Sequence, residues 1–287
     1  MLRNQLYIMF HKKGFQISFI IMTVLSCGLP IYYMLKNIIK ENDISNSVSN
    51  QYAYIFNAHS PISAFAIYFI PILAIMPFSL SYRSEKKLNY SPTVMIRTGI
   101  KKYYTTKAFA CFIGSFLVFF VPLTLNIILN QIFMPETNIN VIGQTLSALI
   151  REDYSGNTSY IEHYSSFPLL ILFLKHPQIY NLLSIFLMSL FCGISGLFSF
   201  AISLKIRNYI YFSALPMIII LLAGYKFREL FEQGIVSGRM FVNLVMTDYC
   251  IPESLQGKNY ALFALFCFII TLVSFSIVKL HAKDDQL

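Results

Sequence analysis

The sequence predicts an all-α integral membrane protein with six transmembrane helices, cytoplasmic N- and C-termini, and amphipathic helices in its outer loops. Three observations support this. Hydrophobic residues make up 56% of the 287 residues, charged residues only 12%, and the mean hydropathy is +0.60, whereas soluble domains carry about 25% charged residues. Six apolar stretches approach the roughly 20 residues that cross a bilayer. Most basic residues fall between these stretches on one side, so we expect one transmembrane domain over residues 1–287.

The first predicted elements are an interfacial helix and a span. Residues 1–13 contain Arg3, Lys12 and Lys13 among apolar side chains, which indicates a helix lying in the membrane interface. Residues 14–35 carry no charge and form the first predicted span. This apolar run is too long for a signal peptide, so we expect it to be retained.

Five further spans are predicted over residues 61–82, 108–132, 177–204, 208–225 and 259–279. Prolines such as Pro30 and Pro122 indicate kinks, whose freed backbone carbonyls can be satisfied by neighbouring helices. The span interiors hold essentially no Asp, Glu, Lys or His, the residues with which carriers move protons or sodium. We therefore expect any transport by this chain to draw its energy from elsewhere.

The basic residues orient the bundle. With the N-terminus in the cytoplasm, 14 of the 22 Lys and Arg residues and 3 of the 13 Asp and Glu residues fall on the cytoplasmic side. The alternation is clear at the cytoplasmic loop 83–107 and weak at the fifth span, where Lys226 and Arg228 follow on the outer side. The outer loops 133–176 and 226–258 contain amphipathic stretches, which we expect to lie as helices on the outer membrane surface.

Enzyme motifs are missing from the chain. It has no GxxxxGK[ST] phosphate loop, no GxGxxG, no HExxH and no GxSxG. His59, His163, Asp248 and Cys250 all fall in predicted outer loops and could meet around a metal ion, but we expect them to be ordinary loop residues. We therefore predict no catalytic residue, metal or cofactor in this chain and expect a protein that is not an enzyme.

Two sets of small polar residues lie within predicted spans. Asn126 and Asn130 are one turn apart on the third span, and we expect them to line a path, to bond across helices, or to cap the outer end of the helix. The fourth span carries small residues on roughly one face, which favours close helix packing over lining of a path. These residues are Ser189, Cys192, Gly196 and Ser199.

The loop 83–107 reads RSEKKLNYSPTVMIRTGIKKYYTTK and contains seven basic residues and one acid. Asn89, Ser91 and Pro92 interrupt it, and a second helical stretch is expected from Thr93. The loop is longer than a simple turn and shorter than a domain. Two interpretations remain: a charge cluster against lipid headgroups, or a docking element for a cytoplasmic partner.

This arrangement resembles the permease subunits of ABC exporters of the second type, a six-helix family that includes drug, polysaccharide and bacteriocin exporters. The resemblance covers essentially the whole chain, from the basic N-terminal segment to the broken amphipathic loop before the sixth span. The family's inner loop has a Glu, a Gly four residues later, a basic residue, an aromatic and a Lys. The residues that match in order are Glu85, Arg97, Tyr103 or Tyr104, and Lys107. Asn89 stands in place of the Gly and also tolerates a left-handed turn.

The resemblance implies a mechanism. Two permease chains, identical or sister, would form the translocation path, and two separate ATPase subunits would bind ATP and Mg²⁺ beneath it. The helix after the second span would sit in a groove on the ATPase, and residues 226–250 would form an outer re-entrant hairpin. The cargo would be a hydrophobic or amphiphilic peptide, drug or lipid, and the location a bacterial plasma membrane. The coupling residues implied are Glu85, Lys86, Lys87, Leu88, Asn89, Tyr90, Arg97 and Lys107.

Two other classes of function remain open. A stand-alone membrane immunity or sensor protein would act through its outer loops without a nucleotide-binding partner. A secondary carrier or membrane enzyme would lose its activity when the ion gradient collapses. A co-purifying ATPase would favour the exporter.

Overall fold

The computed structural model of the chain describes residues 1–39, 72–77, 81–82, 85, 90–133, 177–205, 215–232 and 260–284. These residues form helices and short connections and contain no strand. Residues 72–75 form a short helical stretch that ends in a turn at 76–77. The helices are, in chain order, α1 (Leu2–Phe10), α2 (Lys13–Ile39), α5 (Tyr90–Thr98), α6 (Ile100–Phe133), α10 (Pro177–Lys205), α11 (Leu215–Glu232) and α12 (Tyr260–Asp284).

Three helices are long and apolar enough to cross a membrane, within Ile100–Leu129, Ile179–Lys205 and Tyr260–Lys283. Helices α1 and α2 meet at a bend of 63° and qualify as a fourth span when they are taken together. The prediction of a helical fold is therefore confirmed over the described residues, and three of the helices have the length and apolar composition that a membrane span requires. Six spans and the membrane side of the termini stay predictions, because most of the predicted span 61–82 lies outside those residues.

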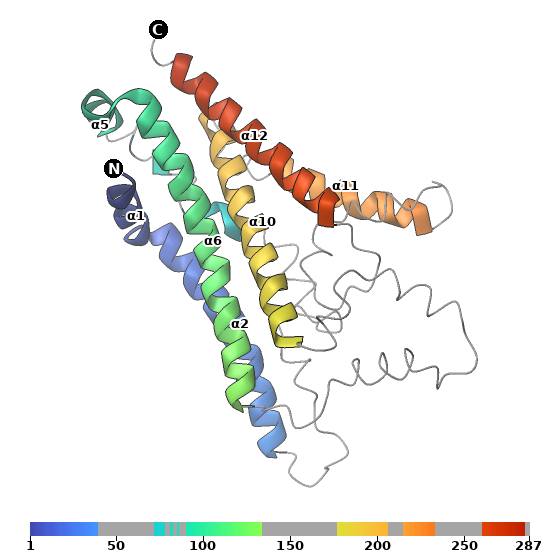
Figure 1. The fold of residues 1–287 in the computed structure, drawn as a ribbon. Helices are drawn as coiled ribbons and strands as arrows, with labels where there is room; N and C mark the ends of the chain where they lie inside the picture. The colour runs from blue at the N-terminus through green and yellow to red at the C-terminus, as the bar shows by residue number, and fades with distance from the viewer. Residues whose placement is uncertain are drawn as a thin grey trace.

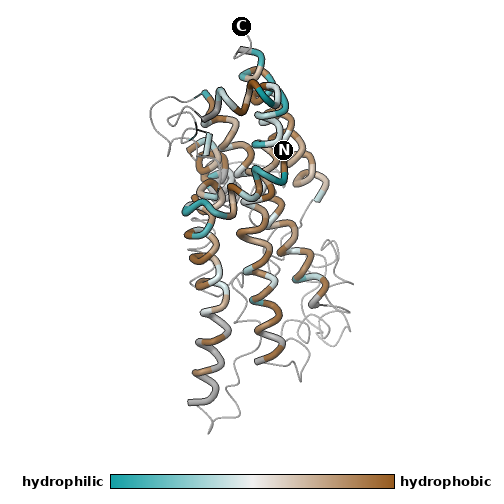
Figure 2. Tube along the Cα trace, turned by 90° about the vertical axis from the view of Figure 1, so that its left-hand side faces the viewer, coloured by the Kyte–Doolittle hydropathy of each residue, from teal (hydrophilic) through white to brown (hydrophobic). Residues whose placement is uncertain are grey.

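The helices run in the directions that alternating spans require. Helices α2 and α6 start at the end of the bundle where both termini lie, and α10 and α12 return to that end (Figure 1). Hydrophilic residues gather at the same end, over α1, α5 and the end of α12, whereas the helix bodies are apolar (Figure 2). This end corresponds to the predicted cytoplasmic side.

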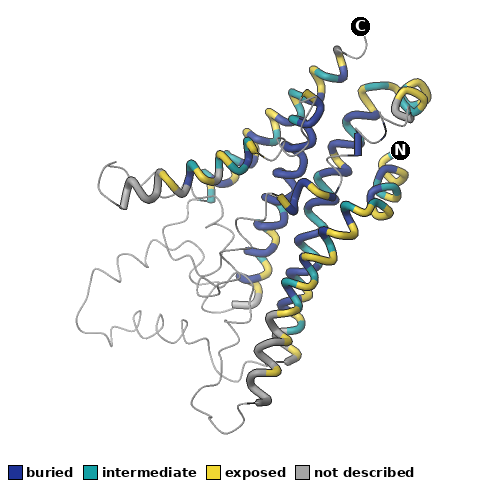
Figure 3. The backbone as a smooth tube through the Cα atoms, turned by 180° about the vertical axis from the view of Figure 1, so that it is seen from behind, coloured by how far each residue is buried: buried dark blue, intermediate teal, exposed yellow. Residues whose placement is uncertain are grey.

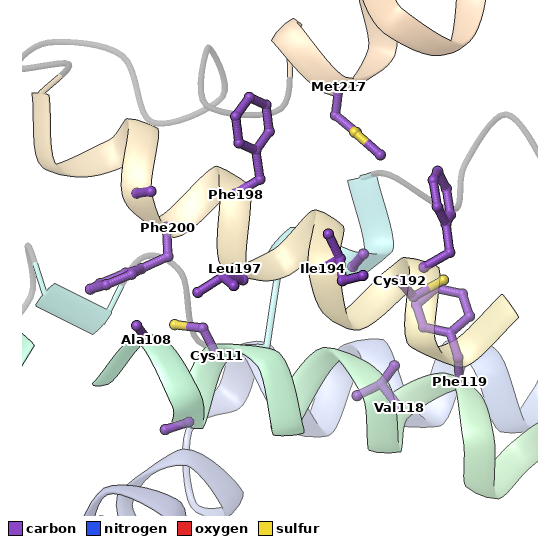
Figure 4. Close-up of a cluster of buried hydrophobic side chains, with 14 of the residues drawn as sticks. Ala108, Cys111, Val118, Phe119, Cys192, Ile194, Leu197, Phe198, Phe200 and Met217 are labelled. Carbon is purple, nitrogen blue, oxygen red and sulfur yellow. The ribbon is translucent and has the colours of Figure 1, made fainter. Parts of the chain in front are cut away.

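Helix α6 lies at the centre of the bundle and contacts α1, α2, α5, α10 and α12. Its closest neighbour is α10, whose apolar span is 78% buried, whereas that of α12 is 28% buried (Figure 3). Helix α10 is thus an interior helix and α12 a peripheral one. Small and aromatic side chains fill the α6–α10 contact (Figure 4), among them Cys111, Val118 and Phe119 of α6 and Cys192, Leu197 and Phe200 of α10.

The fifth predicted span, 208–225, is only partly described, and its described part differs from a simple span. Helix α11 continues past residue 225 to Glu232, and its apolar part is Leu215–Gly224. That stretch is shorter than the roughly 20 residues that a bilayer requires. Helix α11 lies next to the start of α12 and projects away from the bundle (Figure 1).

Candidate functional site

The predicted cytoplasmic loop 83–107 is in large part helical. Helix α5 begins at Tyr90, three residues earlier than predicted, and Pro92 lies in its first turn, where a missing N–H is tolerated. Gly99 ends α5 with φ of +83° and donates its N–H to the Met95 carbonyl at 2.8 Å. A left-handed residue at a helix end favours glycine. Because α6 starts at Ile100, Lys107 lies about two turns inside that helix.

A buried ion pair joins the two chain segments that flank α5. Lys107 Nζ lies 2.6 Å from Glu85 Oε2, and the two side chains are 0% and 8% exposed. The Tyr103 hydroxyl donates to the same Glu85 oxygen at 2.7 Å, and Lys107 Nζ donates to the Tyr103 hydroxyl at 3.0 Å. The Lys107 ammonium also lies 5.0 Å from the centre of the Tyr103 ring, within the range of a cation–π contact.

Aromatic residues extend this cluster. The Tyr104 hydroxyl donates to the Tyr82 hydroxyl at 3.0 Å, and their rings are 5.5 Å apart. The His281 ring of α12 stands edge-on to both, at 5.3 Å from Tyr104 and 6.2 Å from Tyr82. We call Tyr82, Glu85, Tyr103, Tyr104 and Lys107 the α5 base. Three of its polar contacts join positions 18 to 22 residues apart and so link the segment before α5 to the start of α6.

The ion pair of the α5 base is costly to break. A buried ion pair adds little net stability compared with well-packed apolar residues, but removing one partner costs about 3–5 kcal/mol. Both carboxylate and ammonium are withdrawn from solvent here. The end of the second predicted span is therefore fixed against the start of α6. This arrangement can hold α5 in place and can transmit a displacement of α5 to α6.

One face of α5 is turned outward. Val94 and Met95 pack against the buried core, whereas Thr93 and Arg97 are exposed. Ile96 is 85% exposed, the most exposed large hydrophobic residue among those described. The exposed Lys101 and Lys102 follow in the first turn of α6. An exposed isoleucine with exposed basic residues close to it in the sequence therefore stands at this end of the bundle.

The structure separates the predicted coupling residues into two groups. Glu85 and Lys107 face each other in the interior and bond to one another, and the coupling role expected for them stays a prediction. Arg97 is exposed on α5. Residues 86–89, which include Lys86, Lys87, Leu88 and Asn89, lie outside the described residues, as does the side chain of Tyr90.

A charged residue is buried just before the third predicted span. Lys107 lies within the apolar helix α6 and is fully buried. The predicted third span starts just after it, at residue 108. Sequence reasoning missed Tyr82 and His281 altogether. The available signal was that Glu85 is the single acid in a strongly basic loop and needs a cation if it is to be buried.

Asn126 bonds across helices, one of the three roles expected for it. It is 2% exposed, and its side-chain amide donates to the Ser26 carbonyl of α2. Ser26 precedes Pro30 by four residues, and a proline cannot donate to the carbonyl four residues before it. Asn126 therefore satisfies the carbonyl that Pro30 frees. The side chain of Asn130 lies outside the described residues.

The small residues predicted for helix packing lie in the interior of α10. Ser189, Cys192 and Ser199 are 0% exposed. Gly196 approaches the Ser115 side chain of α6, and a Cβ there would lie 3.0 Å from the Ala74 carbonyl oxygen. Ser115 donates its hydroxyl hydrogen to that carbonyl. Three segments, 72–77, α6 and α10, therefore meet at Gly196.

No group of three or more His, Cys, Asp or Glu residues that could hold a metal ion occurs in the described part of the chain. The loop residues His59, His163, Asp248 and Cys250 lie outside it. No protein-family model, curated protein or solved structure matches this chain.

Proposed function

We propose that this chain is the membrane permease subunit of an ATP-driven exporter, and that a separate ATPase docks on α5 and moves the bundle through the α5 base. One observation carries the proposal. An exposed surface helix stands on a buried, polar-bonded base whose larger part, Tyr103, Tyr104 and Lys107, belongs to the central helix of the bundle.

The proposal rests on how a displacement of α5 would spread. The Glu85–Lys107 ion pair and two hydrogen bonds from tyrosine hydroxyls join the segment before α5 to the start of α6. Helix α6 contacts α1, α2, α10 and α12. A displacement of α5 would therefore be transmitted through α6 to these four helices. Packed interiors shift between discrete arrangements, so small movements at such a joint become movements of whole helices.

The docking surface we propose consists of Thr93, Ile96, Arg97, Lys101 and Lys102. An exposed Ile within a basic surround suits a partner that offers an apolar socket with an acidic rim. Glu85 and Lys107 hold this surface in place from beneath and do not touch the partner. Residues 86–90 stay part of the proposed coupling segment on the basis of the family resemblance.

The remaining parts of the proposal rest on the sequence and on what the family resemblance implies. The chain has no phosphate loop of its own, so the partner would bind ATP and Mg²⁺. A second permease chain, identical or sister, would complete the path. The cargo would be a hydrophobic or amphiphilic peptide, drug or lipid, and the location a bacterial plasma membrane.

The test is purification of the tagged chain from its native membrane in mild detergent, followed by an ATPase assay. The expected result is a stoichiometric partner with a Walker A motif and vanadate-sensitive hydrolysis. Ile96→Asp and Arg97→Glu should each reduce the recovered ATPase about tenfold or more, because they place an acid in the proposed contact.

The matched control is Lys279→Glu, which reverses an exposed charge on α12 at the same end of the bundle. It should leave recovery of the ATPase unchanged. A chain that purifies without any nucleotide-binding partner would overturn the proposal and favour a stand-alone immunity or sensor protein.

A secondary carrier is the second candidate, and the buried Glu85–Lys107 pair favours it. Ionisable residues inside a membrane bundle commonly mark ion or proton pathways. Transport that stops when the ion gradient collapses and continues without ATP would select this function over the exporter.

A further inference from the structure

A second lysine approaches the α5 base from the elbow between α1 and α2. Met9, at the end of α1, is 0% exposed, and its sulfur occupies the space where a side chain on Gly114 of α6 would begin. Gly114 follows Lys107 by seven residues. Seven residues are two helical turns, so both lie on one face of α6, about 10 Å apart. The elbow therefore packs on the face that carries Lys107.

The elbow also touches the segment that leads to Glu85. A Cβ on Gly14, just after the elbow, would lie 2.5 Å from the carbonyl oxygen of Met76. Lys12 thus stands between a contact with α6 and a contact with the segment 72–77. It is half-buried, while its neighbour Lys13 is exposed.

The electrostatic surroundings of Lys12 agree with this placement. Burial lowers the pKa of Lys12, and the Glu85 carboxylate acts in the opposite direction and raises it. The two charges are therefore within electrostatic reach, although Lys107 makes the direct contact with Glu85.

Glu85 has acceptor capacity left for a second cation. Its Oε2 atom accepts from Lys107 and Tyr103. Its Oε1 atom is buried and has no hydrogen-bond partner among the described residues. A buried acceptor without a donor costs about 1–3 kcal/mol, and more when it is charged. A second positive charge beside Oε1 is therefore favourable.

We propose that Lys12 is a positioning residue that shares Glu85 with Lys107 and thereby holds the α1–α2 elbow on the α5 base. The consequence for transport rests on the proposed function: a movement of α5 would reach the first span through Lys12 as well as through α6. The contact itself does not depend on an ATPase.

The test is hydrogen–deuterium exchange of the purified full chain in lipid nanodiscs, measured on peptides that cover residues 2–12. Lys12→Met should speed amide exchange in α1 about tenfold, because local opening of the elbow costs less once the shared charge is lost. Lys12→Arg, which keeps the charge, should exchange like the unmodified chain. Lys13→Met is the matched control and should also leave exchange unchanged.

Glu85→Gln completes the test as a double-mutant cycle. It should speed exchange in α1, and adding Lys12→Met should then have no further effect. Equal effects of Lys12→Met and Lys13→Met would overturn the proposal, as would loss of protection in Lys12→Arg or additive effects in the double variant. If Glu85→Gln does not fold, the three lysine variants decide alone.

Failure of this inference and failure of the proposed function are distinguishable. A chain without an ATPase partner that still shows the Lys12 effect refutes the exporter and keeps the inference. A chain that co-purifies with its ATPase but shows no effect of Lys12→Met refutes the inference and keeps the exporter.

Discussion

Replacing Lys107 with Met removes the buried ammonium of the α5 base while keeping the length and apolar volume of the side chain. Glu85 is then left in the interior with the Tyr103 hydroxyl as its remaining described donor. The structure gives the pair a separation of 2.6 Å with side chains 0% and 8% exposed. Removal of one partner from such a pair costs about 3–5 kcal/mol.

The double variant Lys107→Met with Glu85→Gln should lose less than either single variant. It leaves no uncompensated charge, and the remaining loss comes from the hydrogen bonds at Tyr103, about 1–2 kcal/mol. With about 3–5 kcal/mol lost in each single variant and about 1–2 kcal/mol in the double variant, the coupling free energy between the two sites should be at least about 4 kcal/mol. At roughly 2–4 °C per kcal/mol, each single variant should lower the unfolding midpoint by about 10 °C.

The assay is thermal unfolding in detergent, followed by a maleimide dye that fluoresces on reaction with thiols. Cys111, Cys192 and Cys267 are buried, so their thiols should react only as the bundle opens. Lys101→Met is the matched control, because Lys101 is exposed on the same helix. Its effect should stay within about 0.5 kcal/mol.

The reasoning fails if the two single variants add in the double variant, or if Lys107→Met unfolds at the temperature of Lys101→Met. Additive effects would mean that Glu85 and Lys107 act independently. The absence of an effect would mean that water or headgroups reach the pair.

Two further predictions use matched substitutions and the same unfolding assay. Asn126→Leu should lower the free energy of unfolding by about 1 kcal/mol, because it leaves a buried carbonyl without its donor. Adding Pro30→Ala supplies a backbone N–H to that carbonyl, so the double variant should recover stability. A further loss of stability in the double variant would contradict the assignment. Gly196→Ala should destabilise the chain by about 1–3 kcal/mol through overpacking. The control is Gly28→Ala, whose Cβ would meet nothing within 4 Å and which should be neutral or slightly stabilising. Equal effects of the two substitutions would show that α10 does not pack closely against α6 and the segment 72–77 at Gly196.

The buried position of Glu85 also changes which substitution tests docking. Glu85→Lys would place a second ammonium group against Lys107, so it would disrupt the α5 base whether or not a partner binds there. Ile96 and Arg97 are the positions at which contact with a partner can be changed without entering the interior.

Composition and charge were sufficient to predict a helical membrane protein. Apolar runs such as the one after Lys107 must be helical, because only helices and closed barrels satisfy their backbone groups in lipid. The face of α10 that carries small residues could also be predicted, since Gly196 and its serine neighbours recur at helical spacing. The ends of the helices were less readable: α6 starts at Ile100 because Gly99 turns the chain there.

By itself, the sequence determined which stretches are helical and apolar, and where basic residues separate them, because these properties depend on residues close together in the chain. Only the tertiary structure decided which polar groups meet inside. Glu85 finds Lys107 across the α5 loop, and Asn126 finds the carbonyl that Pro30 frees a hundred positions away. Such pairs are set by desolvation: a polar group removed from water must find whichever partner the packing of the helices brings within reach.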